Sequence, residues 1–186
     1  MKRIMTEAIS DLGYALLGLL RQNPCSGYEL RKIFVVTAMM SYSDSPGAIY
    51  PALRRLEQQG LIRGRIEEGP GLRRRQMFRL TAKGTAELKR WIKRPVTREE
   101  VVHCGREVML RFALSEAAAG PSASVKILES LEAELASYLP SLRQQLNEQK
   151  PMLPRSGRLA LESGIQGYEC LLEWAKYALT TYCGKE

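Results

Sequence analysis

The chain has 186 residues, 45% of them hydrophobic, and carries 28 Lys and Arg against 20 Asp and Glu. This length allows one good core or two modest ones, and the composition excludes a long disordered protein. The positive charge is concentrated in one half, since residues 1–94 hold 18 Lys and Arg against 8 Asp and Glu, whereas residues 95–186 hold 10 against 12. Because clustered cations release counterions from duplex phosphates, this asymmetry indicates a nucleic-acid-binding half joined to a near-neutral half. A basic surface that only improves solubility is the alternative.

Targeting and redox features indicate a cytoplasmic protein. Acidic Glu7 and Asp11 precede any apolar run, so we expect no signal peptide. The longest apolar run, residues 14–20, is far shorter than the ~20 residues of a membrane span. The cysteines lack C-x-x-C spacing and are expected to be free thiols, with a redox switch as the alternative. They are Cys25, Cys104, Cys170 and Cys183.

Two helices and a connector are predicted at the start of the chain. A first helix extends from a cap at Ser10-Asp11 to Asn23-Pro24. Residues 26–29 have the Ser-x-x-Glu spacing of a capping box, which predicts a second helix that runs through Phe34. The polar residues 42–46 are typical of a connector that caps a third helix.

The third helix, in residues 45–58, has an apolar back and a basic front. Its predicted buried residues follow i, i+3, i+4, i+7 spacing and are Ile49, Ala52, Leu53 and Leu56. The residues left outside are Gly47, Tyr50, Arg54, Arg55 and Gln58. Pro51 means either that the helix begins near Gly47 or that the helix is kinked.

A basic hairpin and a fourth helix follow. Residues 61–66 alternate and predict a strand, residues 69–71 (Gly-Pro-Gly) a turn, and residues 73–80 the returning strand. A helix followed by a basic hairpin indicates a winged helix-turn-helix. Thr81 is expected to cap the fourth helix, which stops at Arg94-Pro95, and we place the domain boundary there.

The arginines of the third helix and the hairpin can bind DNA. A guanidinium donates two parallel hydrogen bonds to a phosphate or to guanine O6 and N7, so we expect Arg54 to read a base. Arg73, Arg74 and Arg75 stand beside the Gly-Pro-Gly turn and are better suited to phosphates or the minor groove. A solvated surface run is the alternative for these three arginines, and packing on its own domain is the alternative for Tyr50.

The second half is predicted to be all helical. Thr97 and Glu100 form another capping box, which opens a helix that ends near Gly120-Pro121. A longer helix follows, with a kink expected at Pro140. A last helix has apolar residues in alternating steps of four and three, as in a seam that packs against a partner helix. These residues are Leu161, Ile165, Tyr168, Leu172, Ala175, Leu179 and Tyr182. We expect this seam to form a dimer, with an intramolecular three-helix bundle as the alternative.

Five motifs stand out in residues 12–90. They are Leu16 to Leu20 (LLGLL), Ser26 to Leu30 (SGYEL), Ser45 to Glu57 (SPGAIYPALRRLE), Gly60 to Ile62 (GLI) and Phe78 to Gly84 (FRLTAKG). Together these motifs resemble the PadR family of bacterial transcriptional regulators. The chain departs from the family pattern at residues 76–78, where many members have a lysine followed by two aromatic residues. The second half is similar to the helical dimerisation domain of virulence-activator-type PadR regulators, partly through residues 106–112 (REVMLRF).

The resemblance implies that the third helix enters the major groove and that the wing follows the DNA backbone. Tyr28 matches a tyrosine of the family motif that implies a phosphate contact. We expect DNA contacts from Tyr28, Ser45, Gly47, Tyr50, Arg54, Arg55, Arg73, Arg74 and Arg75. Many family members release DNA on binding phenolic or other aromatic compounds, and Trp91, Trp174 and Tyr177 are candidates for such a ligand pocket. Core packing is the alternative for these aromatic residues.

An enzyme is the rival class of function. His103 is the only histidine, lies in a helical pattern and has no serine or cysteine motif that would make it a base. The sequence has no H-x-x-H, P-loop or GxGxxG motif. We therefore predict no catalytic activity, no cofactor and no metal site. A winged helix that docks an acidic protein is a third hypothesis.

The sequence thus predicts a mainly α fold with a small β-hairpin wing, in two domains. Residues 1–94 form a winged helix-turn-helix DNA-binding domain, and residues 95–186 form a helical dimerisation domain. The expected protein is a cytoplasmic, nucleoid-associated homodimer that binds a palindromic operator in double-stranded DNA. We favour a repressor that a small aromatic ligand releases, over an activator without a ligand.

Overall fold

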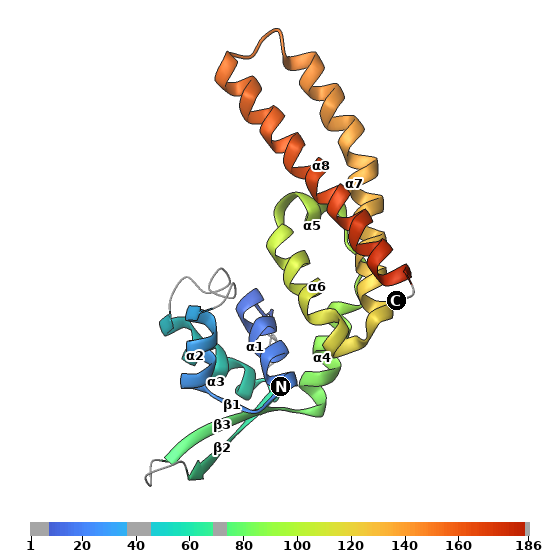
Figure 1. The fold of residues 1–186 in the computed structure, drawn as a ribbon. Helices are drawn as coiled ribbons and strands as arrows, with labels where there is room; N and C mark the ends of the chain where they lie inside the picture. The colour runs from blue at the N-terminus through green and yellow to red at the C-terminus, as the bar shows by residue number, and fades with distance from the viewer. Residues whose placement is uncertain (1–7, 37–45, 69–73, 185–186) are drawn as a thin grey trace, which may run out of the picture. The chain divides into compact units, whose positions relative to one another are not determined.

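The computed structural model describes residues 8–36, 46–68 and 74–184. It divides into two compact units, Met1–Ile92 and Lys93–Glu186. The division falls two residues before the boundary that the sequence predicts. Both units are mainly helical, and the N-terminal unit also contains a small antiparallel sheet (Figure 1).

The described residues of the N-terminal unit form four helices and three strands, with a 3-10 turn before the third helix. The elements are α1 (Asp11–Gln22), β1 (Cys25–Ser26), α2 (Gly27–Val36), the 3-10 turn (Pro46–Ala48), α3 (Ile49–Gln58), β2 (Ile62–Glu68), β3 (Arg74–Leu80) and α4 (Ala82–Ile92). The helix-helix-hairpin order is that of a winged helix, and β2 and β3 form the wing.

Side-chain caps set the beginnings of three of these helices, as predicted. The Ser10 hydroxyl accepts from the Gly13 N–H at 3.3 Å, and α1 ends at Asn23. The Ser26–Glu29 capping box is present at the start of α2, and the Thr81 hydroxyl accepts from the Gly84 N–H at 3.0 Å at the start of α4.

The beginning of α3 resolves the question that Pro51 raises. The 3-10 turn covers the residues before Ile49, so Pro51 is only the third residue of the α-helix, where its missing N–H has no helical acceptor to lose. The α-helix itself is preceded by Ala48 and has no side-chain capping hydrogen bond. Residues 42–45 of the connector, which were predicted to supply a cap, lie outside the described residues.

The sheet has the strand order β1-β3-β2, with both pairs antiparallel. The hairpin pairs Ile62 with Leu80 and Glu68 with Arg74, in agreement with the two predicted wing strands. Strand β1 was not predicted, since its two residues are too few to show an alternating pattern. The predicted Gly-Pro-Gly turn at residues 69–71 lies outside the described residues.

The core of the N-terminal unit lies between the helices and one face of the sheet. Leu16 and Leu17 of α1 are fully buried, and Phe78 of β3 is 6% exposed. The predicted inner face of α3 is confirmed by the burial of its four apolar residues, Ile49, Ala52, Leu53 and Leu56. The amphipathic pattern therefore fixes which face of α3 is left for solvent.

In the C-terminal unit, residues 93–184 are described and form four helices. They are α5 (Arg98–His103), α6 (Gly105–Ala119), α7 (Pro121–Gln149) and α8 (Arg155–Cys183). The Thr97–Glu100 capping box is present, as predicted. The prediction of a single helix after this box is wrong. The helix is interrupted at Cys104, whose φ of −127° and ψ of 30° are not helical. Gly105, a poor helix former, follows directly.

The two long helices of this unit, α7 and α8, pack side by side along much of their length (Figure 1). The helix α7 continues through Pro140. Its inner face carries Leu128, Leu131 and Leu135, each at most 2% exposed. In the described ranges, no helix is long and apolar enough to cross a membrane.

Candidate nucleic-acid interface

The outer face of α3 is exposed and basic. Tyr50 is 52% exposed, and Gly47, Arg54 and Arg55 are also exposed. The inner face of the same helix is buried, so these side chains point away from the core. The structure therefore presents a tyrosine and two arginines of α3 to solvent, as the sequence predicts.

The first turn of α2 lies against Tyr50. A Cβ atom on Gly27 would come within 2.6 Å of Tyr50 Cε1, so only glycine leaves room for the ring at this position. The next residue, Tyr28, is 69% exposed. The beginning of α2 and the exposed face of α3 thus form one continuous surface, which carries two of the predicted DNA contacts.

The capping box holds the beginning of α2 in place. The Glu29 carboxylate accepts from the Ser26 N–H at 2.7 Å and from the Ser26 hydroxyl at 2.8 Å. These two hydrogen bonds, with a smaller contribution from the nearby Arg75 charge, lower the pKa of Glu29 below its usual value. The hydrogen bonds of the cap therefore favour the ionised form of the Glu29 carboxylate.

The turn between α3 and the wing is fixed by several hydrogen bonds. Gly60 has a φ of +70°, a conformation that favours glycine, and lets the chain reverse after α3. The Thr81 hydroxyl donates to the carbonyls of Gly60 and Leu61, and Lys83 Nζ donates to the carbonyl of Gln59. A side chain on Gly84 would collide with the Leu61 carbonyl oxygen at 2.0 Å. These contacts hold the turn at residues 59–61 against the start of α4.

The wing carries arginines on both of its strands. Arg74 and Arg75 are exposed at the start of β3, opposite Glu68 and Glu67 of β2. Ser45 and Arg73, which we also predicted as DNA contacts, lie outside the described residues. The described part of the wing therefore contains two of the three predicted wing arginines.

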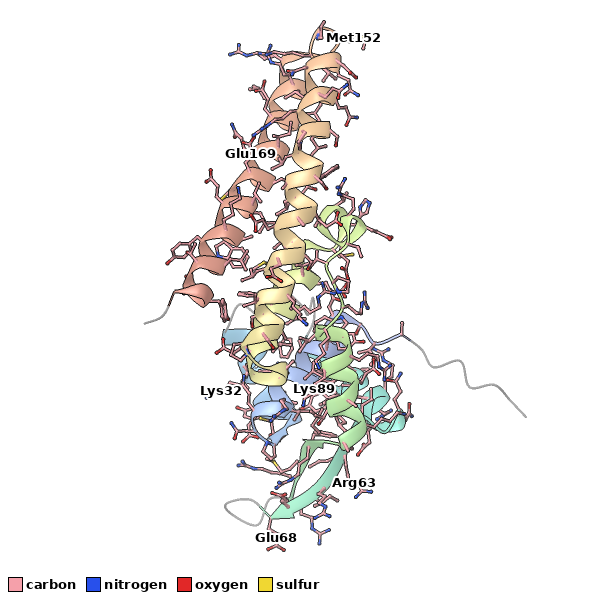
Figure 2. The ribbon with its side chains drawn as sticks, turned by 90° about the vertical axis from the view of Figure 1, so that its right-hand side faces the viewer. Lys32, Arg63, Glu68, Lys89, Met152 and Glu169 are labelled. Atoms are coloured by element: carbon pink, nitrogen blue, oxygen red, sulfur yellow. The ribbon has the colours of Figure 1, made fainter. Side chains whose placement is uncertain are left out.

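Three further arginines of the wing were not predicted as contacts. Arg63 pairs directly with Arg79 across the hairpin, and Arg65 lies two residues further along β2. All three are exposed and line a groove of about 880 Å³. Figure 2 shows Arg63 near the beginning of β2 and Glu68 at its far end. The alternation of residues 62–66 places Arg63 and Arg65 on the face opposite Ile62, which is the signal that could have identified them.

The groove carries an excess of positive charge. Like charges directly opposite each other in a sheet repel, so the Arg63–Arg79 pair favours an anion nearby. Glu67 forms an ion pair with Arg79 at 3.3 Å, but both side chains are about half exposed. Such exposed pairs contribute little to stability, so the arginines remain available to bind phosphate.

The aromatic residues predicted to form a ligand pocket have different surroundings. Trp91 is 1% exposed in the core of the N-terminal unit, where its ring stacks on Tyr14. Trp174 of α8 is half-buried and contacts Phe112 of α6 edge to face, with ring centroids 5.3 Å apart. Tyr177 is 70% exposed. For Trp91 the structure therefore agrees with core packing, which was the alternative to a ligand pocket.

The predicted dimer seam of α8 is partly used within the chain. Ile165 and Ala175 are buried, and Tyr168 packs edge to face on Tyr138 of α7. Leu161 remains 42% exposed. A small apolar cavity of about 150 Å³ lies between the two helices near Leu161 and Leu142. The seam therefore has one partner helix in its own chain.

Metal-binding and redox-active side chains are a further class of candidate site. Among the residues that the structure describes, no cluster of three or more His, Cys, Asp or Glu side chains could hold a metal ion. Cys25, Cys104 and Cys170 are free thiols. The sole histidine, His103, is exposed at the end of α5.

Residues 16–90 match the family model of the transcriptional regulator PadR-like family. The chain is 35% identical over 81 residues to the negative transcriptional regulator PadR of Bacillus subtilis, an alignment that covers 44% of each chain. It is 41% identical over 59 residues to the transcriptional regulator YqjI of Escherichia coli, which covers 32% of this chain and 28% of YqjI. The chain thus spans less than half the length of the curated relatives it matches.

Two solved structures are also similar to this chain. The crystal structure of B. subtilis PadR in complex with operator DNA has a TM-score of 0.44 and 23% identity, and the match covers 92% of this chain and 98% of that one. The PadR-like regulator BC1756 of Bacillus cereus has a TM-score of 0.41 and 23% identity, and that match covers 91% and 94%. The family match places transcriptional regulators rather than enzymes among the relatives. Residues 16–90, which lie in the N-terminal unit, are thus similar to the transcriptional regulator PadR-like family.

Proposed function

We propose that this protein is a sequence-specific DNA-binding transcriptional regulator. The observation that carries the proposal is the division of α3 into a buried apolar face and an exposed face with Tyr50, Arg54 and Arg55, beside an arginine-rich wing. A helix of this kind fits the major groove, and a basic hairpin beside it fits the phosphate backbone. A basic surface that only aids solubility would not require the arginines to share one exposed helix face beside an arginine-rich wing.

Each part of the surface has a role in this proposal. Arg54, in the middle of α3, donates two hydrogen bonds to guanine O6 and N7. The hydroxyl groups of Tyr28 and Tyr50 donate hydrogen bonds to phosphates. Gly47, Arg55 and the predicted Ser45 contact the DNA beside them. Arg74 and Arg75, with Arg73, bind the backbone or the minor groove and fix the position of the protein without selecting bases.

We also propose that the protein acts as a homodimer through its C-terminal unit. Leu161 of the seam stays 42% exposed although α7 covers part of the helix, and Leu159, two residues earlier, is 51% exposed. Two DNA-binding units related by a two-fold axis would bind half-sites one helical turn, about 34 Å, or a multiple apart. Sedimentation equilibrium tests this directly, and a monomer at micromolar concentration contradicts it.

The regulation that we propose is repression relieved by a small aromatic ligand, in the cytoplasm and at the nucleoid. The relative in B. subtilis is described as a negative regulator, which supports repression. The half-buried Trp174 and the exposed Tyr177 of α8 are the candidates for ligand contact. Tryptophan fluorescence across a panel of phenolic compounds tests this part, and emission unchanged by every compound contradicts it.

DNA recognition is tested by selection and binding. The wild-type protein is used to select duplexes from a random pool, and its affinity for a selected duplex and a scrambled one is measured by fluorescence anisotropy across a salt series. We expect a preference of roughly 10³-fold or more for the selected duplex, which Arg54→Ala reduces at one base position. Arg143→Ala, on the exposed surface of α7, is the matched control.

Two results would argue against a regulator. Failure to enrich any duplex, together with equal and steeply salt-dependent binding to all of them, would favour a basic surface that docks an acidic protein. Enrichment that Arg54→Ala leaves unchanged at every base position would remove α3 as the reading element. A reporter gene under an enriched duplex then separates a repressor from an activator.

A further inference from the structure

A single carboxylate links α3 to the wing. Glu57, in the last turn of α3, accepts a hydrogen bond from the backbone N–H of Gly64 in β2, with Oε1 and N 2.7 Å apart. In the described sheet β2 is the outer strand, paired with β3 on one side only. The Glu57 carboxylate therefore takes the place of a neighbouring strand along the outer edge of β2.

The position of Gly64 leaves room for this contact. A Cβ atom there would lie 2.9 Å from Glu57 Oε1 and 2.5 Å from Gln76 Nε2 of β3. The backbone of Gly64 is that of an ordinary strand, so the requirement is for space and not for an unusual conformation. Side chains from α3 and β3 thus converge on a glycine of β2, about halfway between the turn and the far end of the wing.

The charge of Glu57 requires an explanation in a DNA-binding surface. Glu57 is three residues after Arg54 and therefore lies beside it on α3. A carboxylate on this face repels phosphates and lowers the affinity for DNA. A residue that opposes binding by its charge can still favour binding by its geometry, if it holds other contacts in place.

We propose that Glu57 is a positioning residue that sets the angle between α3 and the wing. This inference rests on the proposed function. The turn at residues 59–61 is fixed to α4, but β2 extends beyond that turn, and the bond to Gly64 holds the strand where it leaves the helices. The major groove and the phosphates of a duplex lie at a fixed distance from each other. Arg54 and the wing arginines can therefore contact the same DNA site only when the wing stands at one particular angle to α3.

Two substitutions separate the hydrogen bond from the charge. Glu57→Gln keeps an oxygen that accepts from Gly64 and removes the charge. Glu57→Asp keeps the charge but is one methylene too short to reach. We expect Gln to preserve the preference for a selected duplex over a scrambled one while raising the affinity for both. We expect Glu57→Asp to lower the preference for the selected duplex roughly tenfold. The loss of one charge-assisted hydrogen bond has an effect of about this size.

The matched controls are Glu68→Gln and Glu68→Asp. Glu68 is exposed at the far end of the same strand (Figure 2), four residues beyond Gly64. Both control variants should leave the preference unchanged. Amide hydrogen exchange of Gly64 in the free protein reports the bond itself, and its protection should be kept in Glu57→Gln and lost in Glu57→Asp. Circular dichroism verifies that each variant is folded.

The outcomes distinguish this inference from the function on which it rests. If the wild-type protein shows no preference among duplexes, the proposed function fails. If the wild-type protein shows a preference and Glu57→Asp retains it in full, Glu57 does not position the wing, and the function stands. Equal losses of affinity for both duplexes in Glu57→Asp would show a role in stability alone and would also overturn the inference.

Discussion

The ring of Tyr14 stacks face to face on the ring of Trp91, with ring centroids 4.1 Å apart and planes inclined by 4°. Tyr14 belongs to α1 and Trp91 to α4, the first and last helices of the N-terminal unit. Both side chains are buried, and the Tyr14 hydroxyl donates to Glu87 at 3.4 Å. The stack therefore closes the core of the unit by joining its two ends.

Replacement of Trp91 should destabilise the N-terminal unit. Trp91→Ala removes a large buried side chain and leaves a cavity, and we expect a loss of about 3–5 kcal/mol in the free energy of unfolding. Urea denaturation followed by circular dichroism measures this loss. Tyr177→Ala is the control, because this side chain is 70% exposed and surface substitutions usually change stability by less than about 0.5 kcal/mol. Equal effects of the two substitutions would contradict a core role for Trp91.

Local signals in the sequence were sufficient for most of the N-terminal unit. The cap at Ser10, the Ser26–Glu29 box and the Thr81 cap each depend on residues within three or four positions, so spacing alone locates the helix starts. The spacing of the apolar residues of α3 likewise determined its exposed face, and hence the direction of Tyr50 and Arg54. For the same reason the candidate site on α3 could be predicted before the fold was known.

Features that depend on distant residues could not be predicted in this way. The two-residue strand β1 exists only because Cys25 and Ser26 pair with Phe78 and Met77 of β3. The contact between Glu57 and Gly64 depends on how β2 leaves the turn. Neither feature has a periodic pattern in the sequence. The arginines Arg63 and Arg79 meet because of the hairpin register, which the sequence pattern of a single strand does not specify.

The capping box of α2 should make stability depend on pH in the acidic range. Two hydrogen bonds from Ser26 lower the pKa of Glu29, so the folded-state pKa lies below the unfolded-state value of about 4.3. The contribution of the carboxylate is therefore complete above the unfolded-state pKa and is lost as the pH falls through the folded-state pKa. We expect Glu29→Gln to cost less than about 1 kcal/mol at pH 7, because the amide oxygen still accepts and only a solvent-screened charge is lost, and to cost nothing once Glu29 is protonated.

Urea denaturation of both proteins between pH 7 and pH 2.5 measures this effect. In a Ser26→Ala background one of the two hydrogen bonds to the carboxylate is absent, so the difference that Glu29→Gln makes should be smaller. A difference between wild type and Glu29→Gln that stays constant over the whole pH range would argue against an ionised cap.

The break between α5 and α6 allows one buried ion pair that a continuous helix would prevent. Arg111 is fully buried and donates to both oxygens of Glu100, at 3.1 and 3.4 Å. On one helix, residues eleven positions apart would lie about 16 Å from each other along the axis. The turn at Cys104 brings them together, and Arg94, more exposed, adds a third charge at 3.0 Å from Glu100.

This arrangement predicts an asymmetry between the two partners. Glu100→Ala leaves the Arg111 cation buried without a counter-charge, and we expect a loss of about 3–5 kcal/mol in the free energy of unfolding of the C-terminal unit. Arg111→Met should cost less, because Arg94 still neutralises Glu100 and methionine fills the apolar space. The double substitution Glu100→Gln with Arg111→Met should also cost less than Glu100→Ala alone, since it leaves no buried charge.

The exposed pair between Arg143 of α7 and Glu169 of α8 provides the control for this comparison. Arg143→Gln removes an ion pair whose partners remain hydrated, so the cost should stay below about 1 kcal/mol. Chemical denaturation of the four variants and the wild type measures the series. If Arg111→Met were as costly as Glu100→Ala, the volume of the arginine side chain would matter more than its charge, and the break at Cys104 would serve packing rather than the ion pair.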